Sequence, residues 1–209
     1  MEDIDLLEYE KKLYEEGYEL ICGTDEVGRG PLVGPVVAAA VILPKNYYLE
    51  GLTDSKKLSE KKRCKFYDII IHDAISYGIG IVDAKTIDVI NIYEASRLAM
   101  LKAIEDLKVK PDFVLTDAMP LNIPNSKAII HGDALSESIA AASVVAKVTR
   151  DNMMYELDKL YPMYGFKDHK GYPTKKHLEN LEKYGILDNY RVTYLSLIHI
   201  SEPTRLALI

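Results

Sequence analysis

Residues 23–43 read GTDEVGRGPLVGPVVAAAVIL, and this stretch decides the fold. The flanking apolar runs, at 19–24 and 34–43, are together rich in Val, Ile and Ala, which is typical of buried strands. Between them, Gly28 and Pro31 belong to a glycine- and proline-rich connection that favours a tight turn of the chain. The start of the chain therefore predicts two neighbouring strands of a sheet.

The rest of the chain continues with strands and helices that predict a mixed sheet with helices packed on it. Three early strands are followed by alternating strand, helix and strand, which indicates an α/β fold with five strands. Ser59 and Thr86 are expected to cap two of the helices. Further strands are expected at 77–83, 113–116 and 127–131, and helices at 5–16, 59–74, 86–107, 136–159 and 174–184.

Composition bounds the class of protein. The chain has 209 residues, of which 48% are hydrophobic, so it can bury the core of one domain. A net charge of −6 excludes a basic nucleic-acid coat protein, and any polyanion must meet a local basic face or bound cations. Two cysteines without metal-type spacing, no signal-peptide core and no apolar run of about 18 residues favour the cytoplasm and exclude a membrane span.

Four acids follow apolar runs at expected strand ends: Asp25, Glu26, Asp117 and Asp133. Strand ends at one edge of a sheet converge in space, so acids distant in sequence can form one cluster. Crowded carboxylates repel each other unless cations neutralise them, and oxygen ligands select magnesium or manganese over zinc. The alternative is that such acids only solvate loops or cap helices, which is the better interpretation for Asp133 taken alone.

Gly28 and Gly30 flank Arg29 directly after the Asp25-Glu26 pair. Glycines let the backbone approach a sugar or phosphate closely, and the guanidinium offers a planar fork of donors. An acidic pair beside such a loop indicates metal-dependent chemistry on nucleic acid. The alternative is a plain glycine-rich turn with a surface arginine.

Several motifs, in order along the chain, resemble those of bacterial ribonuclease HII. They are GTDEVGRGPLVGPVVAAAVIL, DSKKL, VLTDAM, IIHGDALSESIAAASVVAKVTRD and HKGYPT, and the resemblance covers roughly residues 18–194. It implies a ribonuclease H-like fold, a mixed five-stranded sheet flanked by helices with a small helical C-terminal part. It also implies metal binding by Asp25, Glu26, Asp117 and Asp133. His131 stands where the family commonly has lysine.

The same resemblance implies the substrate contacts. Gly28, Arg29 and Gly30 would read the 2′-hydroxyl of the ribonucleotide, the group that distinguishes RNA from DNA. Tyr172 would stack on the following deoxyribose. Ser55 and Lys56 would position a phosphate, which fixes register without reading sequence.

The segment 55–65 holds six basic residues against one acid, a charge run that is often only a solvated helix face. Lys147 and Arg150 are further candidates for phosphate contact, or simply exposed residues of the long helix.

The implied activity is an endoribonuclease. It would hydrolyse the RNA strand of RNA–DNA hybrids and cut 5′ to single ribonucleotides in duplex DNA, using two divalent cations, manganese or magnesium. Products would carry 5′-phosphate and 3′-hydroxyl ends. Expected partners are RNA–DNA hybrid and ribonucleotide-containing duplex, with the protein a monomer. The alternatives are another nuclease of this fold that acts on DNA, or a non-catalytic nucleic-acid-binding module.

The expected organisation has three parts: an N-terminal helix in 1–17, the catalytic domain with its C-terminal helical segment in 18–194, and a tail in 195–209. The tail, LSLIHISEPTRLALI, departs from the family and resembles translated sequencing-adapter read-through. We expect it to be non-native. The alternative is a real amphipathic C-terminal segment.

Overall fold

A computed structural model describes residues 5–197, with only the backbone given for 196–197. One sheet of five strands, in the order β3-β2-β1-β4-β5, forms its centre. β1 pairs antiparallel with β2 and parallel with β4, so the sheet is mixed, as predicted. The strands are β1 Ile21–Val27, β2 Val36–Ile42, β3 Ser76–Val82, β4 Phe113–Asp117 and β5 Ser126–Ile129.

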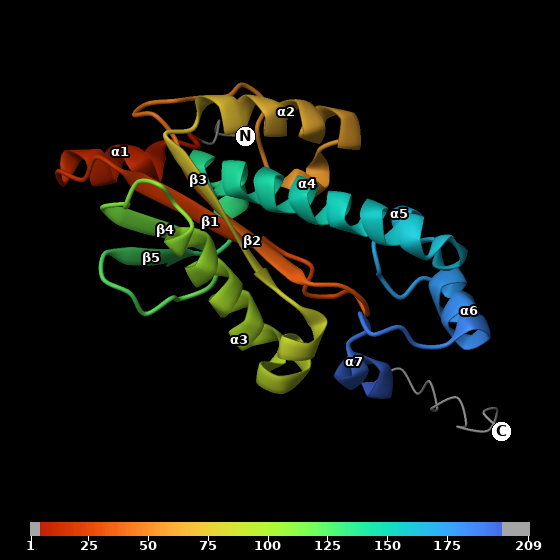
Figure 1. The fold of residues 1–209 in the computed structure, drawn as a ribbon. Helices are drawn as coiled ribbons and strands as arrows, with labels where there is room; N and C mark the ends of the chain where they lie inside the picture. Colours follow the sequence, from red (N-terminus) through yellow and green to blue (C-terminus); the bar gives the residue numbers. More distant parts are fainter. Residues whose placement is uncertain (1–4, 198–209) are drawn as a thin grey trace.

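Helices cover both faces of the sheet (Figure 1). On one face α3 packs its small residues, such as Ala99, against Ala38 of β2. On the other face α4 and α2 meet residues such as Ala39, also in β2. All seven residues of β2 are buried, because this strand has helices on both sides. The long helices are α2 Glu60–Asp73, α3 Ala84–Glu105 and α4 Glu137–Leu160.

The helix caps test the predicted starts. Ser59 caps α2, with its hydroxyl accepting a hydrogen bond from the N–H of Lys62. The prediction of Thr86 as the cap of α3 was wrong. Asp83 is the cap, because its carboxylate accepts from the N–H of Thr86 at 2.7 Å and so satisfies a free donor of the first turn. α3 therefore begins two residues earlier than expected.

The N-terminal helix α1, Glu8–Glu15, is fixed to the start of α4. Glu10 is buried, and its Oε1 accepts hydrogen bonds from the Ser136 hydroxyl at 2.6 Å and from the backbone and hydroxyl of Ser138. Through these contacts a side chain from α1 satisfies donors at the N-terminus of α4.

The C-terminal part forms a small helical layer beyond one end of the sheet (Figure 1). Its aromatic core contains Tyr164, Phe166 and Tyr190, which pack with Leu32 and Val33 of the connection between β1 and β2. The sequence analysis predicted only α6, and missed two short helices. The helices are α5 Phe166–His169, α6 Lys175–Tyr184 and α7 Val192–Leu197.

From residue 198 on, the tail expected over 195–209 lies outside the described residues. Among the helices within 5–197, none has the length and apolar character that a membrane crossing needs.

Candidate active site

Three of the predicted acids meet at one edge of the sheet. β1 and β4 are parallel neighbours with Thr24 opposite Thr116, so Asp25 and Asp117 follow side by side. Asp133 reaches the same point from the chain that follows β5. One carboxylate oxygen from each aspartate lies within 4.8 Å of the others. We call Asp25, Asp117 and Asp133 the aspartate cluster.

The prediction that Asp133 lies at a strand end was wrong. β5 ends at Ile129, and His131 takes a left-handed conformation with φ 59°. A short 3-10 turn, Gly132–Ala134, then carries Asp133 toward the cluster. The Gly132 N–H donates to Asp117 Oδ1 at 2.8 Å, so the turn is tied to the neighbouring acid.

The aspartate cluster is electrostatically unfavourable as it stands. Burial raises the pKa of Asp25 well above its ordinary value, and the charges of Glu26 and Asp117 raise it further. Burial also raises the pKa of Asp133, with Asp117 adding to the effect. Carboxylates that resist ionisation in this way need positive charge, and hard divalent cations prefer oxygen ligands. The donor set therefore fits divalent metal ions.

Glu26 lies beside the cluster rather than within it. Its Oε1 pairs with Arg29 Nη1 at 3.2 Å, whereas its Oε2 is buried and has no hydrogen-bond partner within the described part of the chain. Burial raises the pKa of this carboxyl, and Arg29 opposes that rise. An orphaned buried carboxylate oxygen next to three aspartates is a further position suited to a cation.

The loop of Gly28, Arg29 and Gly30, which we call the GRG loop, directly follows β1. Gly28 has φ +98°, and a Cβ there would lie 2.3 Å from Arg150 Nε. A Cβ on Gly30 would lie 3.2 Å from the ring of Tyr172, so tyrosine and loop are immediate neighbours. Arg29 and Tyr172 are both solvent-exposed. The structure thus brings together two segments that lie about 140 residues apart in the sequence.

Ser55 and Lys56 lie near the cluster and differ in exposure. Ser55 is buried, and its hydroxyl is hydrogen-bonded to that of Ser143 at 2.8 Å. Lys56 is exposed. Neighbouring atoms shield the ammonium partly from water, which acts to lower its pKa. Nearby carboxylates, led by Asp25 and Asp54, raise that pKa above its ordinary value. Lys56 is therefore positively charged at neutral pH and lies beside the acids.

The interpretation of Arg150 as an exposed residue or a phosphate contact was wrong. Its side chain is fully buried and donates to the backbone carbonyls of Pro35, Lys170 and Val33. Lys147 is only partly buried and pairs with Asp151 at 2.6 Å. Arg150 is therefore a structural residue that joins the β1–β2 connection to the Tyr172 segment.

Two residues near the cluster escaped the sequence analysis. Ser143 of α4 hydrogen-bonds Asp25 in a way that lowers the aspartate's pKa, opposing burial. Asp54 raises the pKa of Asp133 by its charge. Asp54 opens the DSKKL motif, which is a signal that could have found it. Ser143 lies in an alanine-rich helix and offers no comparable signal.

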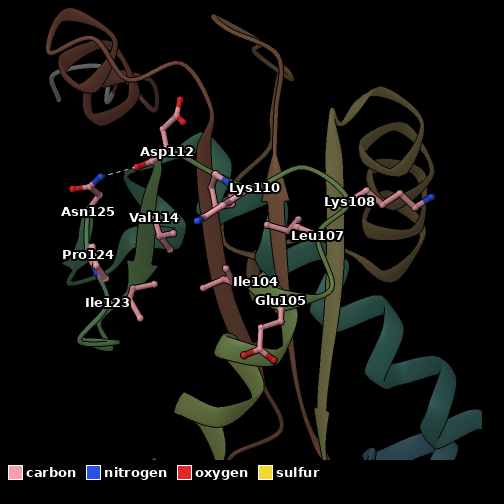
Figure 2. A pocket seen from close by; sticks show the side chains of 11 residues that line it. Ile104, Glu105, Leu107, Lys108, Lys110, Asp112, Val114, Ile123, Pro124 and Asn125 are labelled. Carbon is pink, nitrogen blue, oxygen red and sulfur yellow. Dashed lines mark hydrogen bonds between the residues drawn. The ribbon is translucent and has the colours of Figure 1, made fainter.

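An open cavity of about 580 Å³ lies at the opposite end of β4 from Asp117. Figure 2 shows Ile104, Leu107 and Val114 around it, with Asn125 hydrogen-bonded to Asp112 at the backbone. It contains no member of the aspartate cluster. This cavity is therefore separate from the aspartate cluster, which lies at the opposite end of β4.

Comparison with known proteins decides the family. A family model described as Ribonuclease HII matches residues 22–196. The chain belongs to the ribonuclease HII family. Ribonuclease HII of Bacillus subtilis is 56% identical over 192 residues, covering 91% of this chain and 75% of that protein. Ribonuclease HII of Acholeplasma laidlawii is 54% identical, covering 91% of this chain and 95% of the other.

A solved structure agrees with this assignment. The crystal structure of ribonuclease H2 from Pyrococcus horikoshii superposes with a TM-score of 0.70 at 28% identity, covering 83% of this chain and 92% of that one. The ribonuclease H-like fold and the ribonuclease H activity implied by the motifs are both confirmed. The enzyme is a hydrolase, an endonuclease that acts on RNA–DNA substrates.

Proposed function

We propose that Asp25, Glu26, Asp117 and Asp133 hold two divalent cations, magnesium or manganese, over the phosphodiester to be cut. The support is the aspartate cluster itself: three oxygens within 4.8 Å, raised pKa values and an orphaned Glu26 oxygen beside them. Two such ions activate the attacking water and stabilise the leaving oxygen of a phosphodiester. No protein nucleophile is required.

The side chains around the cluster position the substrate. Lys56 neutralises a phosphate oxygen next to the acids. The backbone of the GRG loop and the Arg29 guanidinium contact the 2′-hydroxyl of the ribonucleotide, and Tyr172 stacks on the sugar that follows. The observation that carries this proposal is that β1 holds Asp25 near its end and, after Val27, runs straight into the GRG loop, so the proposed chemistry and sugar recognition share one strand end.

The enzyme is proposed to cut the RNA strand of hybrids and to cut 5′ to a lone ribonucleotide in duplex DNA, leaving 5′-phosphate and 3′-hydroxyl ends. The test uses a labelled duplex with one ribonucleotide, incubated with magnesium, manganese or chelator, beside an all-DNA duplex. Cutting that needs metal, occurs just 5′ to the ribonucleotide and spares the control supports the proposal. Equal cutting of both duplexes contradicts it and favours a general nuclease.

We also propose that the enzyme works as a monomer in the cytoplasm. The two cysteines are free, one buried and one exposed, as a reducing compartment permits. Light scattering at several protein concentrations tests the oligomeric state, and a dimer mass that persists on dilution contradicts the proposal. Imaging of a tagged chain in a bacterial cell tests the compartment.

A further inference from the structure

Arg191 is a fully buried arginine from the C-terminal segment whose side chain ends beneath the GRG loop. Its Nη2 donates to Gly28 O at 2.7 Å and to Gly34 O at 2.8 Å. Its Nη1 donates to Arg29 O at 3.0 Å, and its Nε to Gly34 O at 3.0 Å. One guanidinium therefore binds three carbonyls at both ends of the loop that follows β1.

The direction of these bonds matters for the opposite side of the loop. In a planar trans peptide the carbonyl and the next N–H point in opposite directions. Because the carbonyls of Gly28 and Arg29 turn inward to Arg191, the N–H groups of Arg29 and Gly30 turn outward. The exposed Tyr172 ring lies beside the same loop, since a Cβ on Gly30 would be 3.2 Å from it.

Tyr194 reinforces the same arrangement from the neighbouring turn. Its hydroxyl donates to Arg29 O at 2.8 Å, and the Arg191 guanidinium lies over its ring at 5.2 Å from the centroid. The start of α7 is itself held, since Asp88 of α3 accepts from the N–H groups of Val192 and Thr193. The support under the loop is thus anchored in the main domain.

We propose that Arg191, assisted by Tyr194, is a positioning residue for ribonucleotide recognition. It fixes the backbone of the GRG loop in the orientation that presents outward N–H donors to the 2′-hydroxyl. This rests on the proposed role of the GRG loop. Arg191 does not touch the substrate, and its contacts do not include the aspartate cluster, so its loss affects substrate selection and leaves metal binding in place.

Lysine at position 191 keeps the charge but lacks the planar fork that binds three carbonyls at once. Arg191→Lys is therefore expected to lower kcat/KM on a duplex with one ribonucleotide by roughly 10-fold to 100-fold, because displacement of a contact by about 1 Å has effects of that size. Its kcat/KM on an all-RNA hybrid should fall similarly, because both substrates carry a 2′-hydroxyl, whereas its affinity for an all-DNA duplex should be unchanged. Manganese affinity, measured by calorimetry without substrate, should be unchanged.

Two companions separate positioning from stability. Met100→Ala truncates a fully buried core residue of α3 and should lower the melting temperature without changing the ratio of the affinities for the one-ribonucleotide duplex and the all-DNA duplex. Tyr194→Phe removes one hydroxyl from a partly exposed ring, so it should fold normally and shift the ratio in the same direction as Arg191→Lys, by less. If Arg191→Lys does not fold, the ratio measured for Tyr194→Phe decides whether these contacts position the loop.

The outcomes are distinct. The inference is supported if the wild-type enzyme prefers the duplex with one ribonucleotide to the all-DNA duplex and both variants lose that preference. A wild type with that preference and variants that keep it, even if less stable, overturns the inference alone. A wild type that fails to cut either substrate, or cuts without regard to ribose, overturns the proposed function instead.

Discussion

Asp25 of the aspartate cluster lies in β1 and the GRG loop directly follows that strand, yet cluster and loop are stabilised in opposite ways. The cluster gathers like charges whose pKa values are raised by burial and mutual repulsion, so it becomes favourable only when cations arrive. The loop is already satisfied, because Arg191 binds its carbonyls from beneath. On the function proposed above, the chemistry therefore depends on an added ion, whereas the recognition of the sugar is preorganised by the fold.

The largest expected effect comes from removing a charge in the cluster. Asp25→Asn should lower kcat by roughly three orders of magnitude or more, because electrostatic support for the reacting phosphate is lost. In chelator, its melting temperature should equal or exceed that of the wild type, since like-charge repulsion is relieved. Activity assays and thermal unfolding check both parts. An Asn variant with near-normal turnover contradicts the metal assignment.

β1, the strand that carries Asp25, should tolerate no added volume. A Cβ at Gly23 would lie 2.1 Å from the carbonyl carbon of Ser138, so Gly23→Ala must push α4 away from β1. We expect a loss of about 3 kcal/mol or more in the free energy of unfolding, measured with urea.

Gly185→Ala is the matched control for this substitution. Gly185 has no atom within 4 Å of an added Cβ and carries only the backbone strain of its φ of 83° and ψ of −171°, about 1–3 kcal/mol. Equal losses in the two variants would show that β1 is not pinned by α4.

A buried acid at the start of α4, Glu137, tests the electrostatic side of the comparison. Burial raises the pKa of Glu137 to about 7, with Glu10 adding to the rise, and its Oε2 has no partner within the described residues. Because the folded-state pKa exceeds the ordinary 4.5, this group's contribution to stability is complete below pH 4.5. The contribution is lost as pH rises to about 7.

Glu137→Gln keeps the acceptor for the Leu49 N–H and removes the charge. It should therefore flatten the stability profile between pH 4.5 and 7 and raise stability at pH 8, by on the order of 2 kcal/mol. Urea unfolding across this pH range measures the effect. A variant that follows the wild-type profile would show that Glu137 does not titrate there.

The smallest expected effect concerns the exposed part of the GRG loop. Arg29→Ala should reduce the binding preference for a duplex with one ribonucleotide over an all-DNA duplex by about tenfold, the size of one charged hydrogen bond. Arg97→Ala removes another arginine that pairs with a glutamate, Glu94, away from the loop, and should leave the preference unchanged. An unchanged preference in Arg29→Ala contradicts its proposed contact with the 2′-hydroxyl.

The sequence predicted the elements whose causes are local. Apolar runs predicted the buried strands. The positions of Asp25 and Asp117 near the ends of two such runs predicted that they belong to the site. Asp133 depended on the family resemblance, because a turn after β5 rather than the strand carries it. The cap of α3 was misassigned to Thr86 because the serine- and threonine-based expectation overlooked Asp83.

What the sequence could not predict depends on contacts between distant segments. Arg191 lies 157 residues from Gly34, whose carbonyl it binds, and nothing in its neighbours Tyr190 and Val192 indicates that role. Arg150 looked like a surface residue of a helix because its burial is created by the β1–β2 connection and the Tyr172 segment. Such residues are recognised only when the chain is folded.

The central claim is that the aspartate cluster is incomplete without cations, and anomalous diffraction tests it most directly. Crystals of the enzyme with an uncleavable ribonucleotide-containing duplex would be soaked in manganese. The account predicts two anomalous peaks about 3.5–4 Å apart, contacted by Asp25, Asp117 and Asp133. Peaks elsewhere, with the cluster empty and the substrate in place, would contradict it.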